Sequence, residues 1–95
     1  MKLSLLRDAK IDAYEAIESF NQLSLGLGAK FEDELFACFD RIKKNPQHYA
    51  ENENGFRAAR LKRFNGVVSF RLWQNTIFVV RILVNGRNIN PDCGG

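Results

Sequence analysis

The order of hydrophobic and polar positions divides this chain into a helical part followed by a strand-forming part. Apolar side chains recur every three or four positions over residues 9–24, and they form one continuous stripe between Phe31 and Ile42. Apolar and polar positions then alternate, as is typical of β-strands, over residues 57–64, 67–73 and 77–85. The pattern therefore predicts two helices followed by three strands.

Residues at the ends of both predicted helices agree with these boundaries. Asp8 can cap the first helix with its side-chain oxygen, and Gly26-Leu27-Gly28 allows a tight reversal between the helices. Helix dipoles favour acids in a first turn and bases in a last turn. The second helix follows this rule with Glu32, Asp33 and Glu34 at its start and Arg41, Lys43 and Lys44 at its end. Asn45-Pro46 then ends the helix.

A leucine-rich segment from Lys2 to Arg7 alternates weakly before the first helix, and we expect it to form an additional first strand. A chain of 95 residues forms one domain, here 1–95. The predicted fold class is therefore α+β with the order β-α-α-β-β-β. In this fold an N-terminal helical hairpin packs on one face of a small, mainly antiparallel sheet.

Alternation also predicts which strand side chains face the helices. If the fully apolar sets share a face, the core side carries Val68, Phe70, Leu72, Phe78, Val80, Ile82 and Val84. The opposite side then carries Ser69, Arg71, Trp73 and Arg81. In residues 57–64 the inward set is Ala59 and Leu61, and the outward set is Arg60, Lys62 and Phe64. A two-residue turn at Gln74-Asn75 would flip one strand and break this scheme.

The charges are divided between the two halves of the chain. Residues 1–54 hold seven bases and ten acids, a net of −3, and residues 55–95 hold seven bases and one acid, a net of +6, which together give +3. The predicted outward face gathers Arg60, Lys62, Arg71 and Arg81 near Trp73 and Phe64, with Arg87 at the exit of the last strand. Such a face suits an anionic partner, which can be RNA, DNA or an acidic protein.

Composition argues against several other classes of protein. No apolar run approaches the roughly 20 residues of a membrane span, and the charged N-terminus is unlike a signal peptide. We expect Cys38 in the core and Cys93 as an exposed tail thiol, which suits a reducing cytoplasm. His48 lies in a polar loop over 46–55, where we expect it to be solvated. Neither a metal site nor a cofactor is predicted.

The ordered set of segments resembles one known family. The helical hairpin of the RelE/ParE toxin superfamily is similar to DAKIDAYEAIESF followed by GLGAKFEDELFACFDRIKKNP, and its sheet is similar to FRAARLKRFNGVVSFRLWQNTIFVVRILVNGRN. The resemblance runs from about residue 3 to 91. It implies a growth-inhibiting toxin of a bacterial toxin–antitoxin pair, of the plasmid-stabilisation kind.

The resemblance implies two sets of contact residues. An antitoxin partner of this family wraps a flexible segment around apolar grooves beside the helices and the sheet edge. Phe36, Leu3 and Leu5 are therefore the predicted antitoxin-binding residues. The predicted target-binding residues are Arg57, Arg60, Lys62, Arg71, Arg81 and Arg87, of which Arg57 and Arg87 match recurrent arginines of the family.

Two activities are known in the superfamily: RelE-like members cleave mRNA on the ribosome, and ParE-like members poison DNA gyrase. Metal-free cleavage needs cations and a group that moves the 2′-hydroxyl proton. Arg60, Lys62 and Arg87 are candidate cations, but Arg87 is followed by no tyrosine and Val67 replaces the RelE-like arginine. A ParE-like toxin that binds a protein such as gyrase is therefore favoured.

Departures from the family pattern leave other readings open. The chain has Phe64-Asn65-Gly66 where many ParE-like members have Phe-Pro-Tyr, and Val84 where many have histidine. The alternatives are a RelE-like, ribosome-dependent mRNA endoribonuclease and an inactive relative that only binds an antitoxin or RNA.

Overall fold

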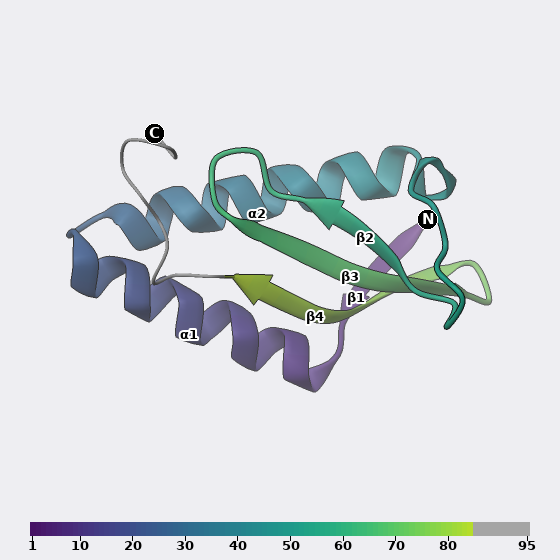
Figure 1. Ribbon diagram of the computed structural model, residues 1–95, viewed down its shortest axis with the longest axis horizontal. Helices are drawn as coiled ribbons and strands as arrows, with labels where there is room; N and C mark the ends of the chain where they lie inside the picture. The colour runs from purple at the N-terminus through teal and green to yellow at the C-terminus, as the bar shows by residue number, and fades with distance from the viewer. Residues whose placement is uncertain (85–95) are drawn as a thin grey trace.

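The computed structural model describes residues 1–84, which form two helices and a four-stranded sheet (Figure 1). The helices are α1 (Arg7–Leu23) and α2 (Leu27–Lys44), and a short 3-10 helix, η1 (Pro46–His48), follows them. The strands are β1 (Lys2–Leu5), β2 (Arg57–Arg60), β3 (Gly66–Trp73) and β4 (Thr76–Val84). This order confirms the predicted α+β class.

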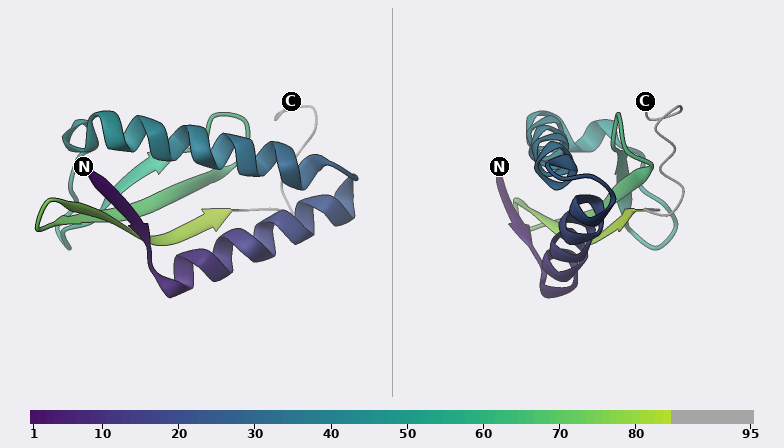
Figure 2. Two further views of the ribbon diagram at one scale, coloured as in Figure 1. Left: turned by 180° about the vertical axis from the view of Figure 1, so that it is seen from behind. Right: turned by 90° about the vertical axis from the view of Figure 1, so that its left-hand side faces the viewer.

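The sheet has the strand order β1-β4-β3-β2 and is mainly antiparallel, as predicted. β2 pairs with β3 and β3 pairs with β4 in antiparallel fashion, whereas β1 lies parallel to β4. Both helices cover one face of this twisted sheet (Figure 2). We call the helix-covered side the inner face and the opposite side, which faces the viewer in Figure 1, the outer face.

The helical hairpin is tighter than its sequence signals suggest. Gly26, with φ of 91°, precedes α2 directly, so α2 begins at Leu27 and the acids Glu32–Glu34 lie beyond its first turn. Gly28 lies inside α2, where a Cβ would come within 2.6 Å of the Ile17 carbonyl oxygen. The prediction of an Asp8 cap is also wrong: α1 begins at Arg7, after Leu6, without a side-chain cap.

Three phenylalanine rings join the two helices to the loop between β2 and β3. The Phe20 ring lies 5.0 Å from Phe31 and 4.9 Å from Phe64, measured between ring centroids. Phe64 is buried, so its predicted outward orientation is wrong. The reason is that β2 ends at Arg60, and alternation does not continue through the loop. Ala59 and Leu61 are buried, as predicted.

The hairpin between β3 and β4 differs from the predicted facing scheme at two points. Gln74 and Asn75 have φ of 47° and 63°, as in a two-residue type I′ turn, which is the arrangement that inverts the following strand. Ile77 and Val79 are consequently buried on the inner face. The prediction that Phe78 and Val80 face the core is wrong. They line a groove on the outer face, described below.

A β-bulge then restores the predicted facing in the second half of β4. The pairing passes from Phe70–Val79 to Ser69–Arg81, which leaves Val80 as an extra residue without a partner. Ile82 therefore returns to the core, while Arg81 shares the outer face with Ser69 and Arg71. The predicted outward orientation of Arg71 and Arg81 is confirmed, because the bulge compensates for the short turn.

Candidate functional site

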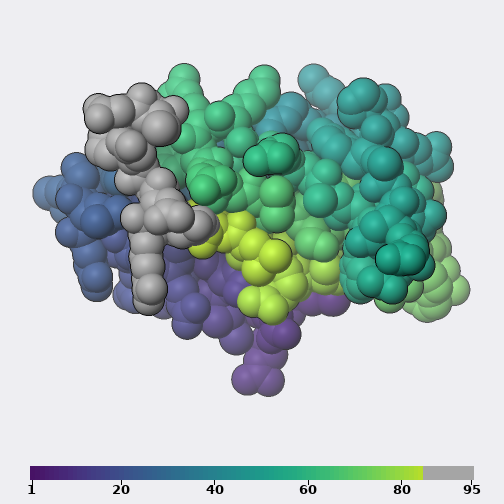
Figure 3. All heavy atoms as spheres, in the orientation of Figure 1, coloured from purple at the N-terminus to yellow at the C-terminus, as the bar shows by residue number. Residues whose placement is uncertain are grey.

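The outer face carries a groove near the β3–β4 turn that combines apolar and cationic side chains. Its lining, which we call the outer groove, is Leu6, Phe56, Arg71, Trp73, Phe78, Val80 and Arg81, around a volume of about 460 Å³. The side chain of Trp73 is 61% exposed. The space-filling view shows the green and yellow strand segments on this side of the molecule (Figure 3). The predicted pair of arginines and Trp73 therefore meet in one groove.

The two arginines of the outer groove differ in their partners. The Arg71 guanidinium lies 5.1 Å from the centre of the Phe56 ring, a cation–π contact. Arg81 forms a forked pair with Asp12 of α1, with Nε–Oδ2 and Nη2–Oδ1 distances of 2.7 and 3.0 Å. Within residues 1–84 this is the one ion pair. Arg71 is thus the cation of the groove that has no carboxylate partner in the described part of the chain.

Asp12 also completes the edge of the sheet. β1 pairs only with the first half of β4, up to Val79, so the following backbone of β4 lies at an edge. The Asp12 carboxylate accepts a hydrogen bond from the Ile82 backbone N–H at 2.9 Å. Partial burial by itself raises the pKa of Asp12. The hydrogen bonds from Arg81 and Ile82, together with the positive charge of Arg81, lower the pKa by more than burial raises it, so the net pKa lies below the ordinary value. Asp12 is therefore held as a carboxylate.

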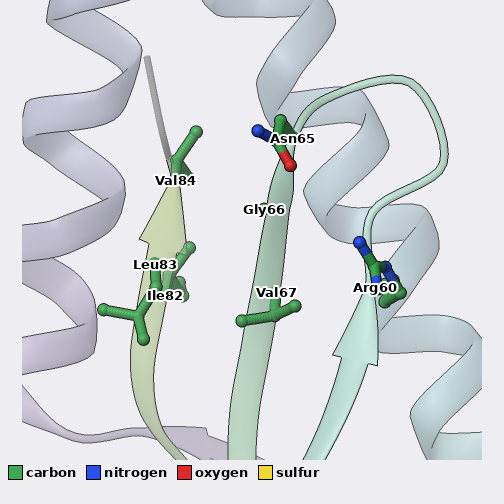
Figure 4. A pocket seen from close by; sticks show the side chains of 7 residues that line it. All are labelled: Arg60, Asn65, Gly66, Val67, Ile82, Leu83 and Val84. Atoms are coloured by element: carbon green, nitrogen blue, oxygen red, sulfur yellow. The ribbon is translucent and has the colours of Figure 1, made fainter. Parts of the chain in front are cut away.

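Arg60 lies apart from the outer groove, at the other end of the outer face. It lines a second, shallow groove with Asn65, Gly66, Val67, Ile82, Leu83 and Val84. Figure 4 shows these residues on β2, β3, β4 and the end of the loop before β3. The lining holds one cation and no carboxylate, imidazole or phenol, so the described residues supply no proton-transfer group there.

The remaining predicted cations do not join the outer groove. Arg57 pairs with Phe70, is half-buried, and donates a hydrogen bond to the Tyr49 carbonyl, so it lies on the inner side of the sheet. Lys62 is exposed in the β2–β3 loop, where its backbone N–H donates to the Glu34 carboxylate. Arg87 lies outside the described residues, as does Cys93. The described residues of the predicted cluster are thus spread over four places.

A second apolar groove lies on the helix side of the molecule. It is lined by residues of β1, α1 and α2 that include Leu3, Leu5, Tyr14, Ile17, Phe36 and Phe39, around a volume of about 590 Å³. We call it the helix-side groove. Phe36 is 55% exposed there, and Leu3 and Leu5 are half-buried. The three residues predicted to contact an antitoxin therefore line one surface.

Some residues of these surfaces were not predicted from the sequence. Phe56, Phe78 and Val80 line the outer groove, but Phe78 and Val80 were assigned to the core. The signal available for Phe78 and Val80 was Asn75, because Asn tolerates positive φ and therefore favours a two-residue turn at Gln74-Asn75. Asp12 gave no local signal, since its partners lie 69 and 70 positions later in the chain.

Metal binding, membrane insertion and the predicted roles of Cys38 and His48 can be checked over residues 1–84. Over residues 1–84, no three His, Cys, Asp or Glu side chains are placed to hold a metal ion. In the same range neither helix is both long and apolar enough to cross a membrane. Cys38 is buried, as predicted, and burial raises the pKa of its thiol. His48 is exposed, as predicted.

Comparison with solved structures gives a clear similarity of fold. A chain from the chromosomal ParDE TA system from P. aeruginosa superimposes with a TM-score of 0.78 at 20% sequence identity, covering 88% of this chain and 95% of that one. Neither the models of known protein families nor the curated proteins gave a match. The architecture expected from the resemblance to RelE/ParE toxins is therefore confirmed as the fold of this chain.

Proposed function

We propose that this protein is the toxin of a type II toxin–antitoxin pair and acts by binding a protein target such as DNA gyrase. The observation that carries the proposal is the fold, which matches a chain of a ParDE TA system over 88% of this chain and 95% of that one. The matched length supports the same kind of module, one domain in a two-protein system. The helix-side groove and the outer groove then divide two binding tasks between two surfaces.

The helix-side groove supports the part of the proposal that concerns the antitoxin. Its floor is apolar, and Phe36 remains half exposed beside the buried Phe39 ring at 6.2 Å between centroids. An exposed aromatic side chain in a long apolar groove is the usual anchor site for an amphipathic helix of a partner. The antitoxin segment would cover Phe36, Leu3 and Leu5.

The geometry at Arg60 favours target binding over mRNA cleavage. A metal-free ribonuclease needs a general base or acid close to its cations. The groove at Arg60 has no such group among the described residues, and Lys62, in the β2–β3 loop, does not line it. The outer face, with Arg71 and Arg81 around Trp73, suits contact with a protein surface.

Induced expression in bacteria, with and without the protein encoded by a neighbouring gene, tests the proposal. We expect growth arrest that co-expression of an acidic antitoxin relieves. With purified protein, we expect inhibition of gyrase supercoiling or accumulation of cleavage complexes at micromolar concentration. Purified ribosomes carrying mRNA form the parallel assay. Codon-specific breaks that disappear in Arg60→Ala would replace this proposal with RelE-like cleavage, and unaffected growth would reject toxicity.

A further inference from the structure

The outer groove presents apolar side chains at a place where strand alternation alone would put them in the core. Val80 is the extra residue of the bulge, and the short turn directs Phe78 outward beside Trp73, with the two ring centroids 6.5 Å apart. Leu6, 42% exposed, closes the groove on the side of β1. Water therefore contacts a group of aromatic and aliphatic side chains that folding does not cover, as at binding surfaces.

The charged side chains that the strands themselves contribute to the outer face are all basic. The four strands contain no acidic residue, and register places Lys2, Arg60, Arg71 and Arg81 on the outer face. Among residues 1–84, Asp12 is the one acid that forms an ion pair with this face, and it holds Arg81. The Arg71 guanidinium stands over the Phe56 ring and forms no ion pair within residues 1–84. An apolar anchor with a carboxylate beside it would therefore match both the floor and the rim.

The same arrangement fits a nucleic acid less well. Binding to a nucleic acid backbone depends on several cations that follow successive phosphates. At the outer groove Asp12 already neutralises one of the two arginines, and Arg60 lies in a separate groove at the far end of the face. A protein segment requires only an apolar anchor and one or two acids, and Trp and Arg are enriched at the centres of protein interfaces.

We propose that the outer groove is a docking site for an acidic protein segment that places a leucine or phenylalanine against Trp73, Phe78 and Val80 and a carboxylate on Arg71. The proposal rests on the proposed function only in assigning this face to the target. It adds the chemical class of the segment and the position of its anchor. The site is separate from the helix-side groove, which lies on the other side of the sheet between β1, α1 and α2.

The single tryptophan of the chain makes the groove directly observable. Because Trp73 is that tryptophan, its emission reports this groove alone. We expect the acetylated, amidated peptide Asp-Glu-Leu-Phe-Glu-Asp to shift Trp73 emission to the blue with a dissociation constant on the order of 0.1–1 mM. A peptide with Ser-Gly in place of Leu-Phe, and one with lysines in place of all acids, should each bind at least about tenfold more weakly.

Variants on each surface separate this site from the others. Arg71→Ala should weaken the peptide about tenfold, since it removes the charged contact. Phe36→Ala in the helix-side groove and Arg60→Ala at the far end of the same face should leave binding unchanged, with circular dichroism confirming the fold of each. Equal binding by Arg71→Ala, or no emission shift up to about 1 mM peptide, would overturn the proposal. Tighter binding of uridylate or thymidylate decamers would overturn it in favour of nucleic acid.

Failure of the proposed function gives a different result from failure of this site. If expression does not arrest growth but the acidic peptide still binds at Trp73, the docking site stands and the toxin proposal falls. If growth arrest and antitoxin rescue occur while the peptide does not bind, the toxin proposal stands and the outer groove has another occupant.

Discussion

Phe64 is the residue whose burial decides how the β2–β3 loop joins the helices. Its ring lies 4.9 Å from Phe20 and 5.3 Å from Phe31, and all three rings are buried. A loop that carries a core aromatic residue is fixed to the helical hairpin. Burial of Phe64 therefore helps to place Asn65 and Gly66, which line the groove at Arg60.

Phe64→Ala should lower the free energy of unfolding by about 3–5 kcal/mol, because it removes a buried ring and leaves a cavity between two others. Chemical denaturation measures the loss. Phe36→Ala is the matched control, since Phe36 is 55% exposed, and it should cost less than about 1 kcal/mol. Similar losses in the two variants would contradict the burial of Phe64.

Asp12 should make stability depend on pH in the acid range. Its folded pKa lies below its ordinary value of 3.8, so the unfolded chain binds this proton more readily. The stabilisation is then complete above about pH 5 and is lost as the pH falls through 3.8 and below. Asp12→Asn should flatten this part of the curve of unfolding free energy against pH. An unchanged acid slope in Asp12→Asn would show that other carboxylates cause it.

The ion pair also changes the choice of charge variants. Arg81→Glu would place a second carboxylate beside Asp12. A loss of function in that variant could then come either from the lost contact with the target or from repulsion between the two carboxylates. Arg71→Glu is the cleaner probe, because Arg71 has no carboxylate partner within residues 1–84. Exposed charges contribute little to stability, and Arg71→Glu should therefore unfold at nearly the same denaturant concentration as the natural protein.

The helical hairpin depends on close contact between its two helices at Gly28. Its backbone N–H donates to the Asn21 side chain at 2.8 Å, and an added Cβ would lie 2.6 Å from the Ile17 carbonyl oxygen. Gly28→Ala should destabilise the protein by about 1–3 kcal/mol, because backbone must move apart. Thermal unfolding measures this change. Ala29→Gly is a control without the clash and should cost about 1 kcal/mol or less.

The β3–β4 turn can be improved without altering its geometry. Gln74 and Asn75 both have positive φ, a conformation that Asn-Gly adopts with less strain. The double change Gln74→Asn and Asn75→Gly should therefore stabilise the protein by about 0.5–1 kcal/mol in denaturation experiments. It should leave Trp73 emission unchanged, since the residue pairing is retained. A loss of stability would show that the turn is not of this type.

The order and type of the elements could be predicted from the sequence, but the faces of β4 could not. Periodicity is a local signal, so it predicted both helices, the first strand and the three later strands. The two-residue turn and the bulge each reverse the face on which the following β4 residues lie. The two reversals cancel each other only from Arg81 onward. Arg71 and Arg81 were therefore placed correctly, whereas Phe78 and Val80 were not. Phe64 was misplaced for a separate reason, because β2 ends at Arg60 and alternation does not continue into the loop. Pairing across the chain, as at Asp12, has no local sequence signature.

The two apolar grooves of the molecule lie on opposite sides of the sheet, and the N-terminal segment that includes β1 contributes residues to both. Leu3 and Leu5 belong to the helix-side groove, whereas the next residue, Leu6, belongs to the outer groove. Substitutions in one groove should therefore leave the other intact. This separation lets the two proposed binding tasks be tested independently.

Phe36→Glu should abolish relief of growth arrest by the antitoxin while leaving toxicity intact, because it places a charge in the helix-side groove. Arg71→Glu should do the reverse, with toxicity reduced and antitoxin capture retained in a pull-down. Arg63→Glu, an exposed loop arginine outside both grooves, is the charge-matched control and should behave like the natural protein. The same phenotype from Phe36→Glu and Arg71→Glu would contradict two separate surfaces.

The parallel pairing of β1 with β4 sets the order in which a newly made chain can close. Lys2 pairs with Thr76, so β1 can pair only after a strand that lies 74 positions later in the chain has been translated. At about 5–20 residues per second, the delay is roughly 4–15 seconds. During that interval β1 of a nascent chain lacks the strand with which it pairs. The outer groove, which needs Leu6 beside β4, does not exist until β4 has been synthesised.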